Sequence, residues 1–233
     1  MVARSPEIKV AVVVGAAGAV GAAVVERLRA DGFTVAGLDV EAAAGDRQFV
    51  VDATDRGALT AVVEEVRREL GLVSVLVVTP RERDVAPIGE MVRSRWQTLL
   101  HAHLGATTNA CAAVVPAMVG AGAGTVVIMS SWLALAGIPG EAYQAAATGT
   151  LLSFTKGFAM EVAPAGVRVN CVAVGPTASE LEQGAGPAGG SRVDLPLGRC
   201  ATPEEVADTV AFLVKDGDFY VGQVFEPSAG AVV

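Results

Sequence analysis

The chain has 233 residues, of which 52% are hydrophobic and 18% charged, a composition that suits one large α/β domain with a full core and argues against disorder. The formal net charge of −8 leaves no basic surface to neutralise phosphates, so we expect no nucleic-acid partner. We expect no membrane anchor either, because the apolar stretch 102–118 contains polar residues such as His103 and Asn109.

The three cysteines lie far apart in the chain and none has a CxxC spacing; they are Cys111, Cys171 and Cys200. Neither a disulfide framework nor a metal site is indicated, and the expected location is a reducing cytoplasm. The apolar run near the N-terminus resembles a signal peptide only superficially, because glycines interrupt it, and we expect it to be a first strand.

Short β-branched runs alternate with longer helical patterns along the whole chain. This alternation is typical of βαβ units, and it predicts a Rossmann-like, doubly wound parallel sheet in a single α/β domain over residues 1–233. The expected strands are 9–14, 34–39, 48–51, 74–78, 125–129, 168–173 and 223–225. The expected helices are 19–30, 56–70, 91–119, 141–162 and 203–214.

Two features near the C-terminal end of the chain add to this plan. Thr202 is expected to be the N-cap of the last helix, with Pro203 at its first position. A patch rich in Gly and Ala at 181–191 marks 176–200 as a mobile loop. In such a fold the loop either closes over substrate or is a plain surface connection.

A glycine-rich turn follows the first expected strand and opens a helix; it reads Gly15-Ala16-Ala17-Gly18-Ala19-Val20-Gly21. Small residues let the backbone approach a pyrophosphate, and the helix N-terminus supplies N–H groups and a positive dipole end. We therefore expect this turn to bind a dinucleotide, through Gly15, Gly18, Ala19, Val20 and Gly21.

Asp39 ends the second expected strand, where a carboxylate accepts hydrogen bonds from the adenine ribose and repels a 2′-phosphate. The glycine turn contains no Arg or Lys that would attract that phosphate. NAD(H) is therefore favoured over NADP(H). The alternative is that Asp39 is only a turn residue at the end of a strand.

Further landmarks lie along the rest of the chain: Asp52, Trp96, the run 124–131, Tyr143, and Arg168-Val169-Asn170 followed by Gly175. With these landmarks the sequence resembles the short-chain dehydrogenase/reductase family over essentially its whole length. The resemblance implies that Asp52 contacts the adenine, and that Thr79 and Thr177 lie beside the cofactor. The chain departs from the family's Gly-x-x-x-Gly-x-Gly pattern at Ala19.

The resemblance also implies a catalytic set. A tyrosine exchanges a proton with the substrate oxygen, a serine holds that oxygen, and a lysine four residues after the tyrosine lowers its pKa. Tyr143 stands where the tyrosine is expected, which places Ala147 at the lysine position and leaves Lys156 too far along the helix. For the serine, counting along the strand selects Ser131 and counting back from Tyr143 selects Ser130. We prefer Ser131, because a loop shortens more easily than a sheet register slips.

The position of the family's relay asparagine holds His103. Either His103 takes over part of the role of the missing lysine, or it is a neutral, hydrogen-bonded helix residue. Two further departures touch the same site: Val78-Thr79-Pro80-Arg81 replaces Asn-Asn-Ala-Gly, and Val174-Gly175 replaces Pro-Gly. Together they suggest a relaxed or redirected active site.

Three functions stay open. The first is an NAD(H)-dependent oxidoreductase that interconverts a secondary alcohol and a ketone, acyl-thioester ketones included. The second is a catalytically inactive homologue that serves as a structural subunit of a hetero-oligomer with an active member of the family. The resemblance implies that subunits, in homo- or hetero-oligomers, pair through the helices 91–119 and 141–162. The third is non-redox chemistry of the kind found in halohydrin dehalogenases, against which Ala147 and the retained glycines count.

Overall fold

The computed structural model describes residues 9–42, 47–177 and 195–232. Seven parallel strands form one sheet in the order β3-β2-β1-β4-β5-β6-β7, which confirms the predicted doubly wound fold. The strands are β1 (Val10–Val14), β2 (Thr34–Asp39), β3 (Gln48–Val50), β4 (Val73–Val78), β5 (Gly124–Ser131), β6 (Val167–Val174) and β7 (Val224–Phe225). The strand order reverses between β1 and β4, and sheets of this kind bind ligands beside such a switch point.

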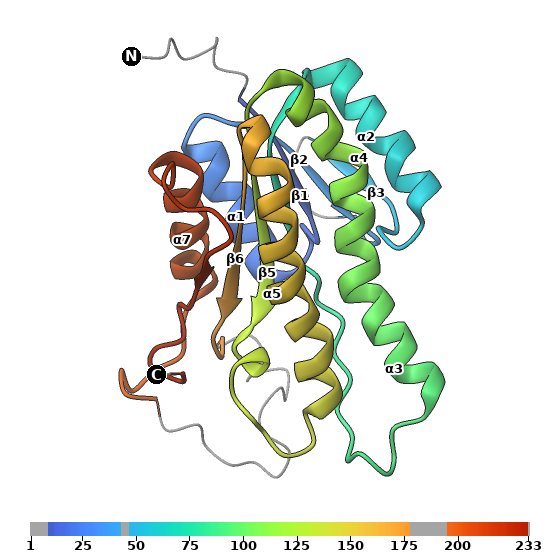
Figure 1. The fold of residues 1–233 in the computed structure, drawn as a ribbon, viewed down its shortest axis with the longest axis vertical. Coiled ribbons are helices and arrows are strands. Elements are labelled where there is room, and N and C mark those ends of the chain that lie inside the picture. The colour runs from blue at the N-terminus through green and yellow to red at the C-terminus, as the bar shows by residue number, and fades with distance from the viewer. Residues whose placement is uncertain (1–8, 43–46, 178–194, 233) are drawn as a thin grey trace.

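Helices cover both faces of the sheet (Figure 1). On one face lie α1 (Ala19–Ala30) and α7 (Pro203–Lys215), and on the other α2 (Arg56–Leu70), α4 (Ala106–Ala121) and α5 (Ala142–Val162). The central strands are buried on both sides; in β1 all five residues are buried. Continuous apolar runs are the pattern expected of such strands, which is why the sequence located them.

The expected N-cap of the last helix is confirmed. Thr202 accepts a hydrogen bond from the backbone N–H of Glu205, and the Glu205 side chain accepts one from the backbone N–H of Thr202. Of the expected loop 176–200, residues 178–194 lie outside the described part of the chain. At its near end Thr177 forms a parallel bridge with Ala201.

The single helix expected over 91–119 is divided in three. It comprises α3 (Arg93–Leu100), a π-helical turn η1 (His101–Gly105) and α4. A π-turn adds a residue to a turn of an α-helix and is frequently found at functional sites. Here η1 carries His103, which is buried and lines the cavity described below.

The span Arg93–Ala121 is long and apolar enough to cross a membrane, by length and composition only. Of its most apolar window, 39% is buried inside the protein. Core helices of water-soluble proteins pass the same test, so the span is weak evidence for a membrane segment.

Candidate functional site

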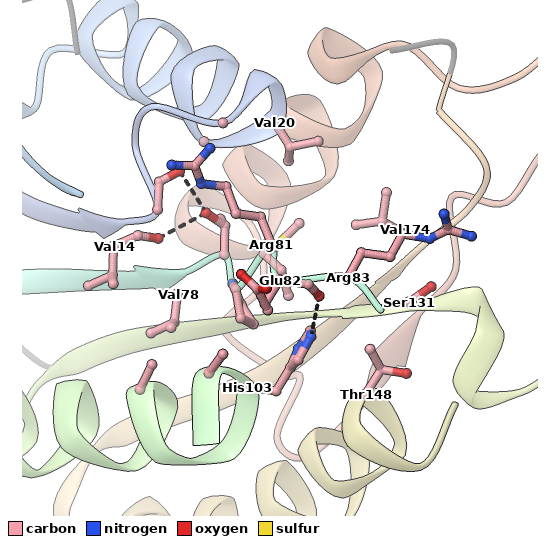
Figure 2. A pocket seen from close by; sticks show the side chains of 18 of the residues that line it. Val14, Val20, Val78, Arg81, Glu82, Arg83, His103, Ser131, Thr148 and Val174 are labelled. Atoms are coloured by element: carbon pink, nitrogen blue, oxygen red, sulfur yellow. Dashed lines mark hydrogen bonds between the residues drawn. The ribbon is translucent and has the colours of Figure 1, made fainter. Parts of the chain in front are cut away.

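A cavity of about 680 Å³ opens at the carboxyl edge of the sheet, where β1, β4, β5 and β6 end. Its wall combines the glycine turn, the segment after β4, the π-turn and the start of α5 (Figure 2). The polar side chains that line it include Asp39, Asp52, Thr79, Arg81, Arg83, His103, Ser130, Ser131, Glu141, Gln144, Thr148 and Thr177.

The glycine turn has the shape that a pyrophosphate requires. Gly15 adopts φ +86°, and a Cβ atom there would lie 2.2 Å from the Thr79 carbonyl oxygen. The Thr79 hydroxyl donates to the carbonyls of Val14 and Gly15 at 2.9 and 3.0 Å, which fixes the turn against β4. The N-cap residue of α1 is Gly18, which has no side chain that could accept hydrogen bonds from the first N–H groups of the helix. The first N–H groups of α1 therefore face the cavity, and the turn fits a dinucleotide phosphate.

Gly21 is expected to tolerate no side chain. A Cβ atom there would lie 2.1 Å from the Gly15 carbonyl oxygen, whereas one at Gly18 would meet the flexible Arg81 side chain at 3.2 Å. Gly21→Ala should therefore lower the free energy of unfolding by about 1–3 kcal/mol through overpacking, and Gly18→Ala by less. Urea denaturation of both variants measures this difference, and equal losses would contradict it.

Asp39, at the end of β2, lines the cavity and is held by partners from within the protein. Its Oδ2 accepts the Ala17 backbone N–H at 2.9 Å, and its Oδ1 accepts the Arg81 guanidinium at 2.8 Å. The Asp39 side chain is only 4% exposed. The structure thus brings Arg81 to the carboxylate, although the sequence had indicated no cation near it.

Asp52 and Thr177, the other residues expected to bind the cofactor, also line the cavity. Asp52 Oδ1 accepts the Thr54 backbone N–H and hydroxyl at 2.8 and 2.7 Å, and the Asp52 side chain lies at the surface. Thr177 is fully buried at the end of the described part of the loop. Among the described residues, no group of three or more His, Cys, Asp or Glu side chains is placed to hold a metal ion.

The expected catalytic pair on α5 needs correction. Gln144 and Thr148 line the cavity, whereas Tyr143 and Ala147 do not. A shift of one residue turns a side chain by about 100° around the helix axis, so only one of the two pairs can face the cavity. The two cavity-facing positions, four residues apart, are therefore Gln144 and Thr148, which carry an amide and a hydroxyl. Each lies one residue later in the chain than the sequence indicated.

The same shift removes the ambiguity over the serine. Ser131 precedes Gln144 by the interval that separates Ser130 from Tyr143, so both ways of counting now select Ser131. Both serines line the cavity. Ser130 donates its hydroxyl to the Thr148 carbonyl at 2.9 Å, while the Ser131 oxygen accepts the Leu133 N–H at 3.2 Å. Ser131 therefore keeps its hydroxyl proton available for a ligand oxygen.

His103 lies beside Gln144 but is held as a neutral group. Its Nε2–H donates to the Glu82 carbonyl at 2.8 Å, and Gln144 Nε2 lies 3.5 Å from the same ring atom (Figure 2). Burial lowers the pKa of His103, against the smaller opposing effect of the Glu82 carbonyl and charge. Within the described part of the chain its Nδ1 has no hydrogen-bond partner. These contacts favour the neutral, hydrogen-bonded alternative for His103.

Arg83 and Glu141 both line the cavity and form an ion pair. Arg83 contacts the carboxylate of Glu141, which is the N-cap residue of α5. The Glu141 side chain is 2% exposed. Burial raises the pKa of Glu141, and the charge and hydrogen bond of Arg83 oppose the rise. Arg81 and Arg83 leave the segment after Val78 in different directions, one toward the glycine turn and the other toward Val174 (Figure 2).

Sequence reasoning missed Arg81, Arg83, Glu141, Gln144 and Thr148. The two arginines were visible in the sequence, Arg81 at the end of the segment that replaces Asn-Asn-Ala-Gly and Arg83 just after it. Their partners were not, because Asp39 and Glu141 lie 42 and 58 residues away along the chain. The spacing from Ser131 was the one signal that pointed to Gln144.

The chain is similar to known proteins over nearly its whole length. Residues 15–231 match the family model described as enoyl-(acyl carrier protein) reductase. A 3-oxoacyl-[acyl-carrier-protein] reductase of Thermotoga maritima is 32% identical over 97% of this chain and 98% of its own length. A D-threitol dehydrogenase of Mycolicibacterium smegmatis is 30% identical over 89% of this chain and 86% of its own.

Among solved structures, the ligand-free aldohexose dehydrogenase of Thermoplasma acidophilum superposes with a TM-score of 0.86 at 25% sequence identity. The match covers 96% of this chain and 93% of that one. Sequence and fold therefore agree over nearly the full length.

Proposed function

Because the chain belongs to the short-chain dehydrogenase/reductase family of oxidoreductases, we propose that it is a dinucleotide-binding member that has lost carbonyl reduction and serves as a structural subunit. One observation carries the proposal: Gln144 and Thr148 face the cavity at the two positions where the family's tyrosine and lysine are needed. An amide does not exchange a proton near neutral pH, and a threonine supplies no positive charge.

Among the described residues, no tyrosine and no lysine lines the cavity in place of the missing pair. The chain has two tyrosines, Tyr143 and Tyr220, and neither lines the cavity. Lys156 is exposed and also lies outside the cavity lining. With its lowered pKa, His103 is uncharged at neutral pH and does not act as the cation. Burial raises the pKa of the Cys111 and Cys171 thiols to about 12, so neither is a nucleophile.

The features that support dinucleotide binding are separate from the catalytic positions. The N–H groups at the start of α1 would hold the pyrophosphate, Asp39 the adenine ribose, Asp52 the adenine and Thr177 the nicotinamide amide. A bound nicotinamide would supply hydride chemistry. Asp39 taken alone favours NAD(H), as expected from the sequence. Ser131 would still orient a ketone or acyl-thioester oxygen, without a proton donor beside it.

An apolar surface on α4 and α5 supports assembly with other subunits. Val119 on α4 and Met160 on α5 are 39% and 74% exposed. Elsewhere on α5, Phe154 stacks on Phe158, and both rings are only partly buried. Exposed apolar side chains of this kind on long helices are typical of protein interfaces. We propose that the chain forms homo- or hetero-oligomers through these helices and works in the cytoplasm.

The proposal is tested by titrating the purified protein with NADH and NADPH in a calorimeter and then adding simple and acyl-thioester ketones. We expect heat of nucleotide binding and no measurable nucleotide oxidation. Steady turnover of a ketone would overturn the loss of catalysis. Absence of binding to either nucleotide would overturn the binding role.

A further inference from the structure

The Asp39 carboxylate is already occupied by a cation of the protein itself. The Arg81 guanidinium lies 2.8 Å from Asp39 Oδ1 and 3.5 Å from Glu41 Oε2. The stem of Arg81 passes over the glycine turn, where its Cδ lies within 3.2 Å of a Cβ atom built at Gly18. Arg81 thus sits between the two elements that would hold the adenine ribose and the pyrophosphate.

The usual effect of an acidic residue at this place requires a free carboxylate. It favours NAD(H) by accepting the ribose hydroxyls and by repelling the two negative charges of a 2′-phosphate. Both effects weaken when a guanidinium satisfies one carboxylate oxygen and cancels the charge. The Ala17 N–H and Arg81 together engage both oxygens of Asp39, and the Glu41 N–H adds a longer contact of 3.4 Å.

We propose that Arg81 neutralises Asp39 and makes the ribose subsite accept NADP(H) as well as NAD(H). The inference rests on the proposed dinucleotide binding. The Arg81 side chain is 44% exposed while that of Asp39 is 4% exposed. The guanidinium therefore has room to turn toward a 2′-phosphate and keep one hydrogen bond to Asp39, because its five N–H donors serve two acceptors at once.

Two acidic residues lie close to the Arg81 guanidinium. Arg81 faces Asp39 from β2 and Glu41 just beyond it. Burial by itself would lower the pKa of Arg81, but the hydrogen bonds and charges of Asp39 and Glu41 raise it, so the guanidinium stays charged. Of the described residues, Asp39 and Glu41 are the charged groups that act on Arg81, so removing Arg81 would leave these two carboxylates where a 2′-phosphate would bind.

The test is calorimetric titration of wild type, Arg81→Ala, Arg81→Lys and Asp39→Asn with NADH and with NADPH. Wild type should bind the two nucleotides within about fivefold of each other. Arg81→Ala should shift the ratio of dissociation constants toward NADH by roughly ten- to hundredfold, the range of one hydrogen bond to a charged group. Arg81→Lys should keep most of the wild-type ratio, and Asp39→Asn should shift it toward NADPH.

Arg67→Ala is the matched control, because Arg67 forms an exposed ion pair with Glu64 on α2 and does not line the cavity. It should leave both affinities unchanged. An unchanged ratio in Arg81→Ala, with both nucleotides still bound and thermal melting like wild type, would overturn the role of Arg81 alone. Failure of wild type to bind either nucleotide would overturn this inference together with the proposed binding function.

Discussion

The double substitution Gln144→Tyr and Thr148→Lys is expected to raise the rate of ketone reduction at least about hundredfold above wild type. Proton transfer by a positioned acid is worth about 10²–10⁴-fold, and a phenol needs a neighbouring cation to bring its pKa toward neutrality. Ser131 already lines the same cavity. The rate is measured as nucleotide oxidation with an acyl-thioester ketone.

Ala147→Lys is the matched control for this gain. It creates a tyrosine and lysine four residues apart, Tyr143 and the new lysine, but on side-chain positions that do not line the cavity. This variant should stay inactive, and each single substitution of the active pair should give much less than the double. Activity in Ala147→Lys equal to that of the double variant would show that Tyr143 is the acid, and it would contradict the assignment of Gln144 and Thr148 to the catalytic positions.

Arg83→Ala is expected to lower the free energy of unfolding at neutral pH by about 3 kcal/mol. Removing one partner of a buried ion pair leaves the other charge without compensation, which costs roughly 3–5 kcal/mol; Arg83 is 30% exposed, which favours the lower end. The loss should be largely recovered in Arg83→Ala with Glu141→Gln, which removes the orphaned charge. Urea denaturation of the three proteins measures both effects.

The pH dependence of this loss has a definite sign. Glu141 has a raised pKa in the folded protein, chiefly because of burial, so the folded state binds its proton more tightly than the unfolded state does. Stability from this group is therefore fully present below the unfolded pKa and is lost as pH rises through the folded one. Without Arg83 the folded pKa rises further, so the defect of Arg83→Ala should shrink from pH 7 toward pH 5. A defect that grows on acidification would contradict the assignment.

Local patterns were enough to predict the fold. The bounds of α1 and α2 agree with the sequence, and the strands differ from their expected ends by at most two residues. These elements depend on apolar periodicity and on glycines within a few residues, which a single sequence contains. The π-turn at η1 was not predictable, because the extra residue in that turn is stabilised by packing of His103 against the segment after β4.

The site was predicted less completely, for two physical reasons. Tyr143 has the same residue type as the family's acid. However, the side chains of α5 that face the cavity depend on the residue at which the helix begins, after Glu141. The sequence alone does not show where the preceding loop ends and the helix starts. The ion pairs of Arg81 and Arg83 join segments far apart in sequence. The spacing of residues along the chain does not predict which side of a helix faces the cavity, and it does not predict ion pairs between distant segments.

We propose that the protein binds a nicotinamide dinucleotide but has lost the proton-transfer step. A single-turnover experiment tests this proposal, with protein in molar excess over NADH and an acyl-thioester ketone in excess over both. Because product release does not limit a single turnover, it separates missing chemistry from slow release. We expect the bound nucleotide to be oxidised no faster than in the uncatalysed reaction. Oxidation of the bound nucleotide in one fast phase would contradict the loss of proton transfer.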